Sequence, residues 1–209
     1  MGQEVIRAVD ADEELSLSYC VDPVVDHTEL DKGSLPQKLV SAAGELDPAD
    51  IDIIVDFDGL SELKSHYEVS KNTRLKKYET AIKDVSIDIY VPFWSIVGLP
   101  ADVVRQSGVN REGFRVPPPE VLLVTKLAAY RVRRATVKGQ KDLIDIVSLL
   151  GLPEFDWTSF RRWIGQAETD VSSDLRGLIQ KQTEIPELSL NKHAFAKHKK
   201  AWLKELQSS

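Results

Sequence analysis

The spacing of apolar residues changes along this chain of 209 residues. Residues 50–56, DIDIIVD, alternate acidic and aliphatic side chains with a period of two, which is typical of a strand with one polar and one buried face. From about residue 100 onward, apolar side chains recur three and four positions apart, as they do on one face of a helix. Strands therefore precede helices, and the sequence predicts an α+β protein.

Local patterns predict the other elements. Residues 75–93 are expected to form a hairpin that turns near Lys83 and Asp84. SELKSHYEV predicts a short helix with Ser61 as a candidate N-cap, and RRATVKGQK (133–141) predicts a basic loop. Further helices are expected at residues 99–108, 119–134, 142–151, 157–168, 172–182 and 193–206. We expect an α+β core with a mixed or antiparallel sheet over residues 1–115, its first 30 or so unassigned, and a helical part over residues 116–209 packed on it.

Composition excludes several classes of protein. With 42% hydrophobic and 29% charged residues, the chain has the composition of a globular protein rather than a disordered or fibrous one. A net charge of −6 argues against binding nucleic acid by overall attraction, although it leaves room for a local basic patch. Cys20 is the single cysteine, and no apolar run or leader pattern indicates a membrane segment. The expected location is the cytoplasm, with no membrane partner.

Three aspartates are candidate metal ligands. In a strand, Asp50 and Asp52 point to the same face, and they repel each other unless water or a cation lies between them. Asp88, between two isoleucines in VSIDIYV, is a candidate third ligand. A pair of Mg²⁺ or Mn²⁺ ions on such carboxylates can hold the phosphoryl oxygens of a transfer reaction. The alternative interpretation is that these acids are simply solvated at a strand end.

Lys126 lies in the middle of EVLLVTKLAAY (120–130), a helix that is apolar nearly all the way round. An ammonium group there is costly unless it is paired, and a polyphosphate or Asp142 would pair it. Two alternatives remain open: Lys126 extends to the surface, or it forms a structural salt bridge with Asp142 or Asp145. Asp142 itself is also a candidate N-cap or first-turn acid of the helix that follows.

The segment GFRVPPPEVLLVTKLAAYRVRRATVKGQKDLIDIVSLL resembles a region of nucleotidyltransferases of the DNA-polymerase-beta type. The likeness is to the AbiEii-like branch, which includes toxins of toxin–antitoxin pairs, and it covers roughly residues 45 to 150. It rests on a Pro-Glu loop end, a helix with Lys126, Ala129 and Arg131, and a following helix with Lys141, Asp142 and Asp145. Upstream, DIDIIVD and SIDIYV resemble the paired and third metal-binding acids of that superfamily.

This resemblance implies a metal-dependent transfer of a nucleoside monophosphate from an NTP to a hydroxyl of RNA, such as tRNA, or of protein. Asp50, Asp52 and Asp88 would hold Mg²⁺ or Mn²⁺, Lys126 would approach the phosphates, and Asp142 would position it. A cognate antitoxin is the partner that the toxin branch implies.

The expected glycine-rich phosphate loop is less regular. Gly33 and Ser34 precede a plausible helix and are the candidates for nucleotide binding, yet the residues before them, DHTELDK, are polar and make a poor core strand. Ser34 is equally well explained as a helix N-cap. A catalytically degenerate binding module with the same fold is therefore the alternative function, and a two-metal nuclease is a third.

The basic clusters NTRLKK and RVRR with KGQK have two interpretations. They are either solvated surface or a local attraction for an RNA backbone.

Overall fold

The computed structural model describes residues 50–82, 85–111 and 114–207. Cys20, Gly33 and Ser34 lie outside these residues. The described part is an α+β structure, as the sequence predicts. Its strands are β1 (Asp50–Ile54), β2 (Ser70–Asn72), β3 (Lys77–Ile82), β4 (Val85–Tyr90), β5 (Val109–Arg111) and β6 (Phe114–Val116). Its helices are α3 (Phe57–His66), α4 (Ala101–Ser107), α5 (Pro119–Arg133), α6 (Val137–Leu150), α7 (Trp157–Ile164), α8 (Val171–Lys181) and α9 (Lys192–Glu205), with a 3₁₀ turn η1 (Pro186–Leu188).

The chain divides into two compact units. The first contains the residues up to Ile96 together with Pro100–Pro117, and the second contains Val97–Leu99 and the chain from Pro118 onward. All described strands belong to the first unit, and α5 to α9 belong to the second. No helix in the described ranges combines the length and the apolar character needed to cross a membrane.

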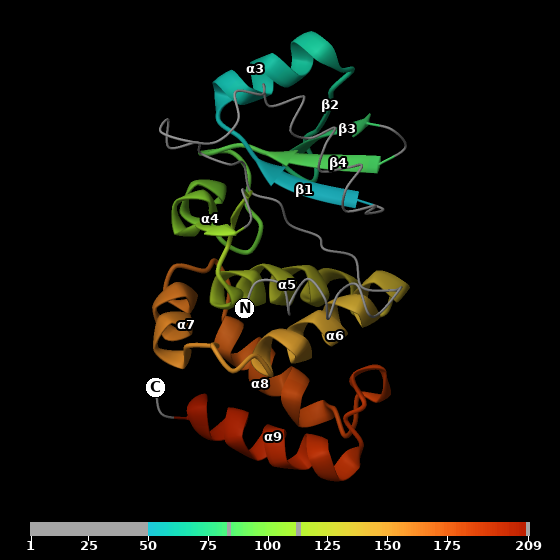
Figure 1. Cartoon of the computed structure of the whole chain (residues 1–209), viewed down its shortest axis with the longest axis vertical. Helices are drawn as coiled ribbons and strands as arrows, with labels where there is room; N and C mark the ends of the chain where they lie inside the picture. Colours follow the sequence, from blue (N-terminus) through green and yellow to red (C-terminus); the bar gives the residue numbers. More distant parts are fainter. Residues whose placement is uncertain (1–49, 83–84, 112–113, 208–209) are drawn as a thin grey trace. The chain divides into compact units, whose positions relative to one another are not determined.

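The first unit is built on a four-stranded sheet in the order β1-β4-β3-β2. β1 and β4 are parallel, and the other neighbours are antiparallel. The alternation in β1 and β4 directs aliphatic side chains to one face, where they pack with Leu60 and Leu63 of α3 in a single core. Figure 1 shows α3 beside this sheet. The opposite face carries the acidic residues.

Helix α3 begins earlier than the sequence predicts. Asp56, rather than Ser61, is the N-cap, and its carboxylate accepts a hydrogen bond of 2.8 Å from the backbone N–H of Gly59. The expectation for Ser61 is therefore wrong. The reason is that Asp56, separated from the end of β1 only by Val55, accepts a hydrogen bond from one of the first free N–H groups of the helix, so no longer loop is needed between the two elements.

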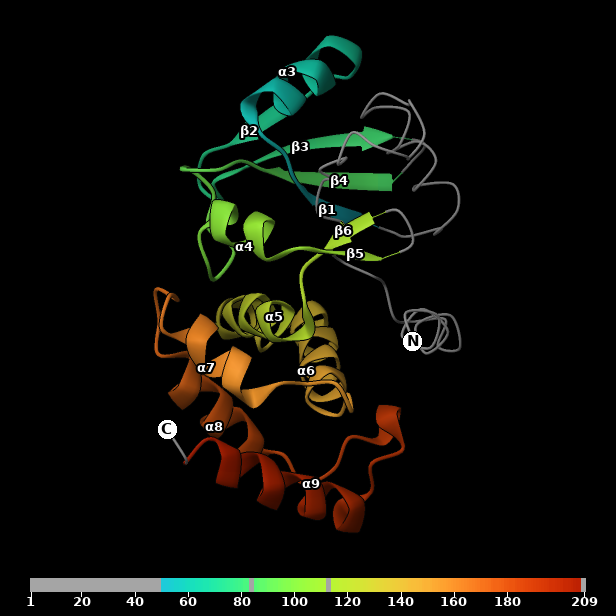
Figure 2. The same ribbon diagram turned by 60° about the vertical axis from the view of Figure 1, so that its left-hand side comes forward.

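The second unit is a bundle of helices, drawn from yellow to red in Figures 1 and 2. Helix α6 starts at Val137, so the expected basic loop over residues 133–141 is wrong for its second half. Thr136 caps this helix through a 3.1 Å hydrogen bond from the N–H of Gly139. Asp142 is consequently inside α6 and is not its N-cap, which corrects the second interpretation of that residue.

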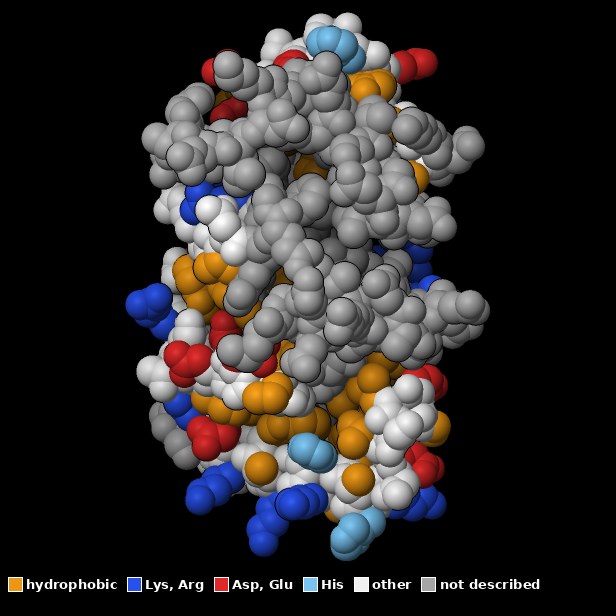
Figure 3. Space-filling view, in the orientation of Figure 1, with side chains coloured by type: hydrophobic (Ala, Val, Ile, Leu, Met, Phe, Trp, Pro, Cys, Tyr) orange, Lys and Arg blue, Asp and Glu red, His pale blue; other side chains and the backbone are white. Residues whose placement is uncertain are grey.

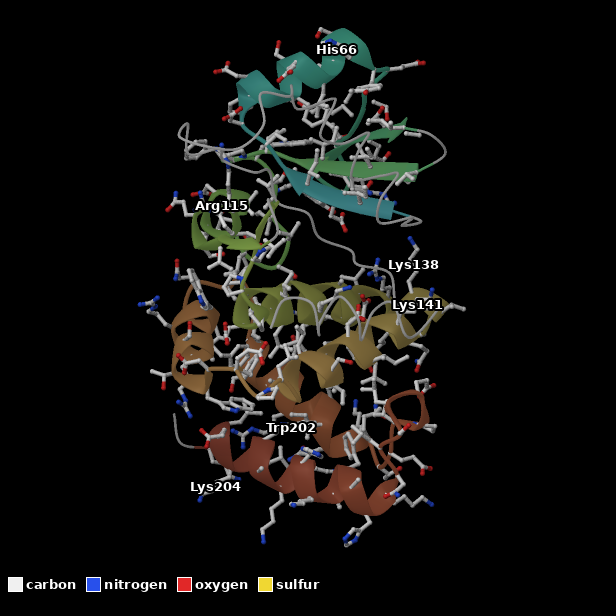
Figure 4. All side chains as sticks on the ribbon, in the orientation of Figure 1. His66, Arg115, Lys138, Lys141, Trp202 and Lys204 are labelled. Atoms are coloured by element: carbon white, nitrogen blue, oxygen red, sulfur yellow. The ribbon has the colours of Figure 1, made fainter. Side chains whose placement is uncertain are left out.

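The last helix has one buried and one basic side. Phe195 and Trp202 are buried in edge-to-face contact, with ring centroids 6.0 Å apart, and Trp202 points from α9 toward α8 in Figure 4. Lys197 and Lys200 are exposed. Figure 3 shows basic side chains projecting from the lower edge of the molecule, where α9 lies. The apolar side of α9 is therefore accounted for by packing within this unit.

Candidate functional site

Asp52 and Asp88 stand next to each other on neighbouring strands. The parallel pairing of β1 with β4 places Asp52 opposite Asp88 and Asp50 opposite Ser86. Because Ile51 and Ile87 are buried on the other face, Asp52 and Asp88 share the polar face, where both are half-buried. Adjacent strands lie about 4.8 Å apart. The structure thus brings together two of the three predicted metal ligands. The backbone of Asp50 lies in the same strand, and its side chain is outside the described part.

The row of acids continues into β3 and includes a cation. Glu79 pairs with Asp88 in the antiparallel register. Lys77, two residues earlier on the same face, donates a hydrogen bond to Asp88 and lies 3.0 Å from the Glu79 carboxylate. Glu79 also accepts a hydrogen bond of 3.1 Å from the Asn72 amide. The polar face therefore holds Asp52, Asp88 and Glu79 in one row, with the Lys77 ammonium between two of them.

The electrostatics of Lys77 and Glu79 follow from this contact. Burial is the largest single influence on the pKa of Lys77 and lowers it, but hydrogen bonds to Asp88 and Glu79, together with their charges, outweigh it. The pKa of Lys77 is therefore raised above 10.5. The hydrogen bond from Lys77 lowers the pKa of Glu79 below 4.5. Both groups are charged at neutral pH.

Sequence reasoning missed Lys77 and Glu79. KYETAI alternates Lys77, Glu79 and Ala81 with Tyr78, Thr80 and Ile82, which is a period of two like that of DIDIIVD. This alternation could have placed both residues on one face. Their position opposite Asp88 depends on the hairpin register, which the sequence pattern does not define to the residue.

In the second unit, Lys126 is 8% exposed on α5 and forms an ion pair with Asp145. This is the structural salt bridge that the sequence left open, with Asp145 as the partner. Asp142, 1% exposed, accepts two hydrogen bonds from the guanidinium of Arg133, at 2.7 and 2.8 Å. Asp142 and Asp145 are three positions apart on α6, so they lie on the same side of the helix, and each pairs with a cation of α5.

The donor set is suited to a hard divalent cation at Asp52 and Asp88. Carboxylate oxygens on adjacent strands are the ligands that Mg²⁺ prefers, and a ligand from Asp50 would come from the same strand. Within the described side chains, however, no three carboxylate, imidazole or thiol groups are close enough together to hold a metal ion. The fit therefore rests on the Asp52–Asp88 pair alone. Gly33 and Ser34, the candidates for nucleotide binding, are outside the described residues.

The second basic cluster lies at the junction of α5 and α6. Figure 4 places Lys138 and Lys141 in the first turns of α6, and both side chains are exposed. Arg131 and Arg134, at the end of α5, are exposed as well. These positions fit solvated surface and a local attraction for polyanions equally well.

Comparison with known proteins identifies no relative of the chain. No family model, no curated protein and no solved structure matches the chain.

Proposed function

We propose that the protein is a metal-dependent nucleotidyltransferase that moves a nucleoside monophosphate from an NTP to a hydroxyl group. The observation that carries the proposal is the parallel register of β1 and β4, which sets Asp52 beside Asp88 on the polar face of the sheet. Asp50, two residues before Asp52 in β1, would complete the ligand set.

Mg²⁺ or Mn²⁺, when bound, supplies charge neutralisation for the phosphoryl oxygens. Asp50, Asp52 and Asp88 would hold the cation, and Asp88 would also accept the proton of the attacking hydroxyl. The hydroxyl oxygen forms a bond to the α-phosphorus while the bond to the leaving pyrophosphate breaks. The resemblance assigns Lys126 to the phosphates and Asp142 to positioning it; within the helical unit, Lys126 is paired with Asp145 and Asp142 with Arg133. The resemblance assigns phosphate binding to the backbone N–H groups of Gly33 and Ser34, which lie outside the described residues.

The acceptor in this proposal is a hydroxyl of RNA, tRNA among the candidates, or of protein. The AbiEii-like resemblance supports a toxin acting in the cytoplasm, with a cognate antitoxin as its partner.

One observation favours a second function, a catalytically degenerate binding module. The Lys77 ammonium already pairs with both Asp88 and Glu79 and offsets one of their two negative charges without a metal ion. An ion network of this kind can be a purely structural feature of the sheet face. In a transferase, by contrast, a metal ion at Asp88 competes with Lys77.

The test incubates the protein with Mg²⁺ or Mn²⁺, each α-labelled NTP in turn and total cellular RNA. The Asp50→Ala/Asp52→Ala variant removes two proposed ligands, and Asp58→Ala/Glu62→Ala removes two acids of α3 as a matched control. Label on RNA or on the protein that disappears only in the first variant supports the transferase. No label from folded protein, combined with no metal-dependent thermal shift in the presence of NTP, supports the binding module. Cleavage of RNA without NTP would contradict both the transferase and the binding module, and it would indicate a nuclease.

A further inference from the structure

Phe93 is unusually exposed for a large aromatic residue. Its side chain is 89% exposed, and its backbone has a φ of 62°, a left-handed conformation that bulky residues rarely adopt. It lies in the loop that follows β4, at the end of the sheet where β3 begins. Strained backbone of this kind persists where the surrounding structure enforces it, and it is concentrated at functional positions.

A buried serine fixes the loop. Ser95, 2% exposed, accepts a hydrogen bond of 3.0 Å from the Val91 N–H, and its hydroxyl donates one of 2.6 Å to the carbonyl of Lys76. The backbone N–H of Ser95 also bonds to the Val91 carbonyl at 3.0 Å. The loop with Phe93 is thereby tied to the turn between β2 and β3. These hydrogen bonds of Ser95 hold the loop in place while the Phe93 side chain is exposed to solvent.

Two cations lie over the aromatic rings of Trp94, the residue that follows Phe93, and of Tyr78. Lys71 Nζ lies 4.7 Å from the centroid of the Trp94 ring, and Lys64 Nζ lies 4.7 Å from that of Tyr78. The two rings contact each other, with centroids 5.2 Å apart. The β2–β3 turn adds two exposed cations. We call this the aromatic–cationic surface; it consists of Phe93, Trp94, Lys64, Lys71, Arg74 and Lys76, and its four cations are exposed.

We propose that the aromatic–cationic surface binds single-stranded RNA. Exposed aromatic rings stack on unpaired bases, and lysine and arginine beside them bind the phosphates, which together make up the usual means of single-strand binding. The net charge of −6 requires the attraction to be local, and a group of four cations provides it. An acidic protein partner would also meet the cations, but it does not explain a rigidly held, solvent-exposed ring.

The position of the surface deepens the proposed function. Lys76 is followed directly by Lys77, which contacts Asp88, and Asp88 lies near the end of β4 from which the Phe93 loop continues. Figures 1 and 2 show β1 and β4 ending where β3 begins. An RNA strand held here lies beyond the end of β4 that follows Asp88, whereas Asp50, which pairs with Ser86, lies toward the other end of the sheet. Its role as the acceptor rests on the proposed function, whereas binding itself does not.

The test measures fluorescence anisotropy of an end-labelled oligouridine with the full chain, without NTP or metal. Phe93→Asn removes the ring and keeps a residue that tolerates the left-handed backbone, so folding is preserved. We expect this variant to bind roughly fivefold to one-hundredfold more weakly. We expect Lys71→Gln/Arg74→Gln to reduce the slope of log affinity against log salt by about 0.7 for each phosphate that the variant no longer neutralises.

Two controls are matched to these variants. Phe57→Ala removes another exposed aromatic ring, and Lys197→Gln/Lys200→Gln removes two exposed cations of α9. Both are expected to bind like the wild type. Duplex RNA, which hides the faces of its bases, should bind more weakly than the single strand.

The outcomes separate this inference from the proposed function. Wild-type affinity in both surface variants, equal losses in the controls, or no RNA binding at all would overturn it. A protein that binds oligouridine through Phe93 but transfers no label contradicts the transferase and leaves the RNA surface standing.

Discussion

Phe93 combines strain with exposure, and its effect on stability can be separated from its effect on binding. A left-handed backbone costs a residue with a β-carbon about 1–2 kcal/mol, and Phe93, at 89% exposure, recovers little of this by burial. Phe93→Gly removes the steric cost, although glycine loses about 0.5–1 kcal/mol more conformational entropy on folding. We therefore expect the free energy of unfolding to rise by about 0.5 kcal/mol, measured by urea denaturation. Phe93→Ala keeps the strain and should show no gain; a gain of the same size there would contradict this explanation.

Gly139 and Gly177 are both helical glycines, yet their surroundings differ. A β-carbon at Gly139 would lie 2.2 Å from the carbonyl oxygen of Arg133, a backbone atom that cannot move aside, because α6 turns closely back on α5 there. At Gly177, in the middle of α8, a β-carbon would meet nothing within 4 Å. Gly139→Ala is expected to lower the free energy of unfolding by about 1–3 kcal/mol, and Gly177→Ala to raise it by about 0.5–1 kcal/mol. Denaturant titration of both variants measures this, and effects of the same sign would contradict it.

At the scale of elements, the pairing of α5 with α6 depends on a buried carboxylate. The Asp142 side chain is 2% exposed and is held by Arg133, which is 40% exposed. Arg133→Gln leaves the Asp142 charge buried with a weaker partner, and we expect a loss of about 3 kcal/mol in the free energy of unfolding. Arg131, on the same helix, lies 3.8 Å from Asp174 with both side chains well exposed, so Arg131→Gln should change stability by less than about 1 kcal/mol. Equal losses would mean that burial of Asp142 is not the cause.

The sheet contains a second ion network, whose contribution to stability depends on pH. The raised pKa of Lys77 gives a contribution that is complete below pH 10.5 and is lost as the pH rises through the folded value. The lowered pKa of Glu79 gives a contribution that is present above pH 4.5 and is lost as the pH falls through its folded value. Lys77→Met removes the first contribution and the largest cause of the second. The difference in stability between wild type and variant, measured in EDTA, should therefore be largest between pH 4.5 and 10.5 and should shrink outside that range.

Some elements could be predicted from the sequence because residues within or next to them determine where they start and end. The β1 strand, α4 between Pro100 and Gly108, and the start of α5 at Pro119 follow from alternation and from proline and glycine positions, and the structure confirms them. The sequence did not predict where α3 and α6 start. Their N-caps, Asp56 and Thr136, lie in segments that look like loops in isolation. The proximity of Asp52 and Asp88 could be predicted because each lies on the polar face of an alternating strand. The partners of Lys77 and Lys126 depend on tertiary register, which no local pattern contains.

At the scale of the whole molecule, the division into two units predicts that the helical one folds by itself. It has its own core, in which Val124, Ile146, Phe160, Leu175 and Phe195 are all 0% exposed. We expect residues 118–209 alone to be helical by circular dichroism and to unfold in one cooperative transition. A fragment that is unstructured, or that melts without a cooperative transition, would contradict independent folding.

The segment Val97–Leu99 refines this prediction, because it belongs to the helical unit although it precedes α4 in sequence. Gly98, with a φ of 86°, packs so tightly on α5 that a β-carbon there would lie 2.7 Å from that of Ala128, and Leu99 is 0% exposed. Burying one leucine is worth about 1.5–3 kcal/mol, and 1 kcal/mol shifts the Tm of a domain of this size by roughly 4–8 °C. A fragment of residues 97–209 should therefore melt at least about 5 °C above residues 118–209, and Leu99→Ala in the longer fragment should remove most of that gain. An equal Tm for the two fragments would mean that the segment does not stabilise α5.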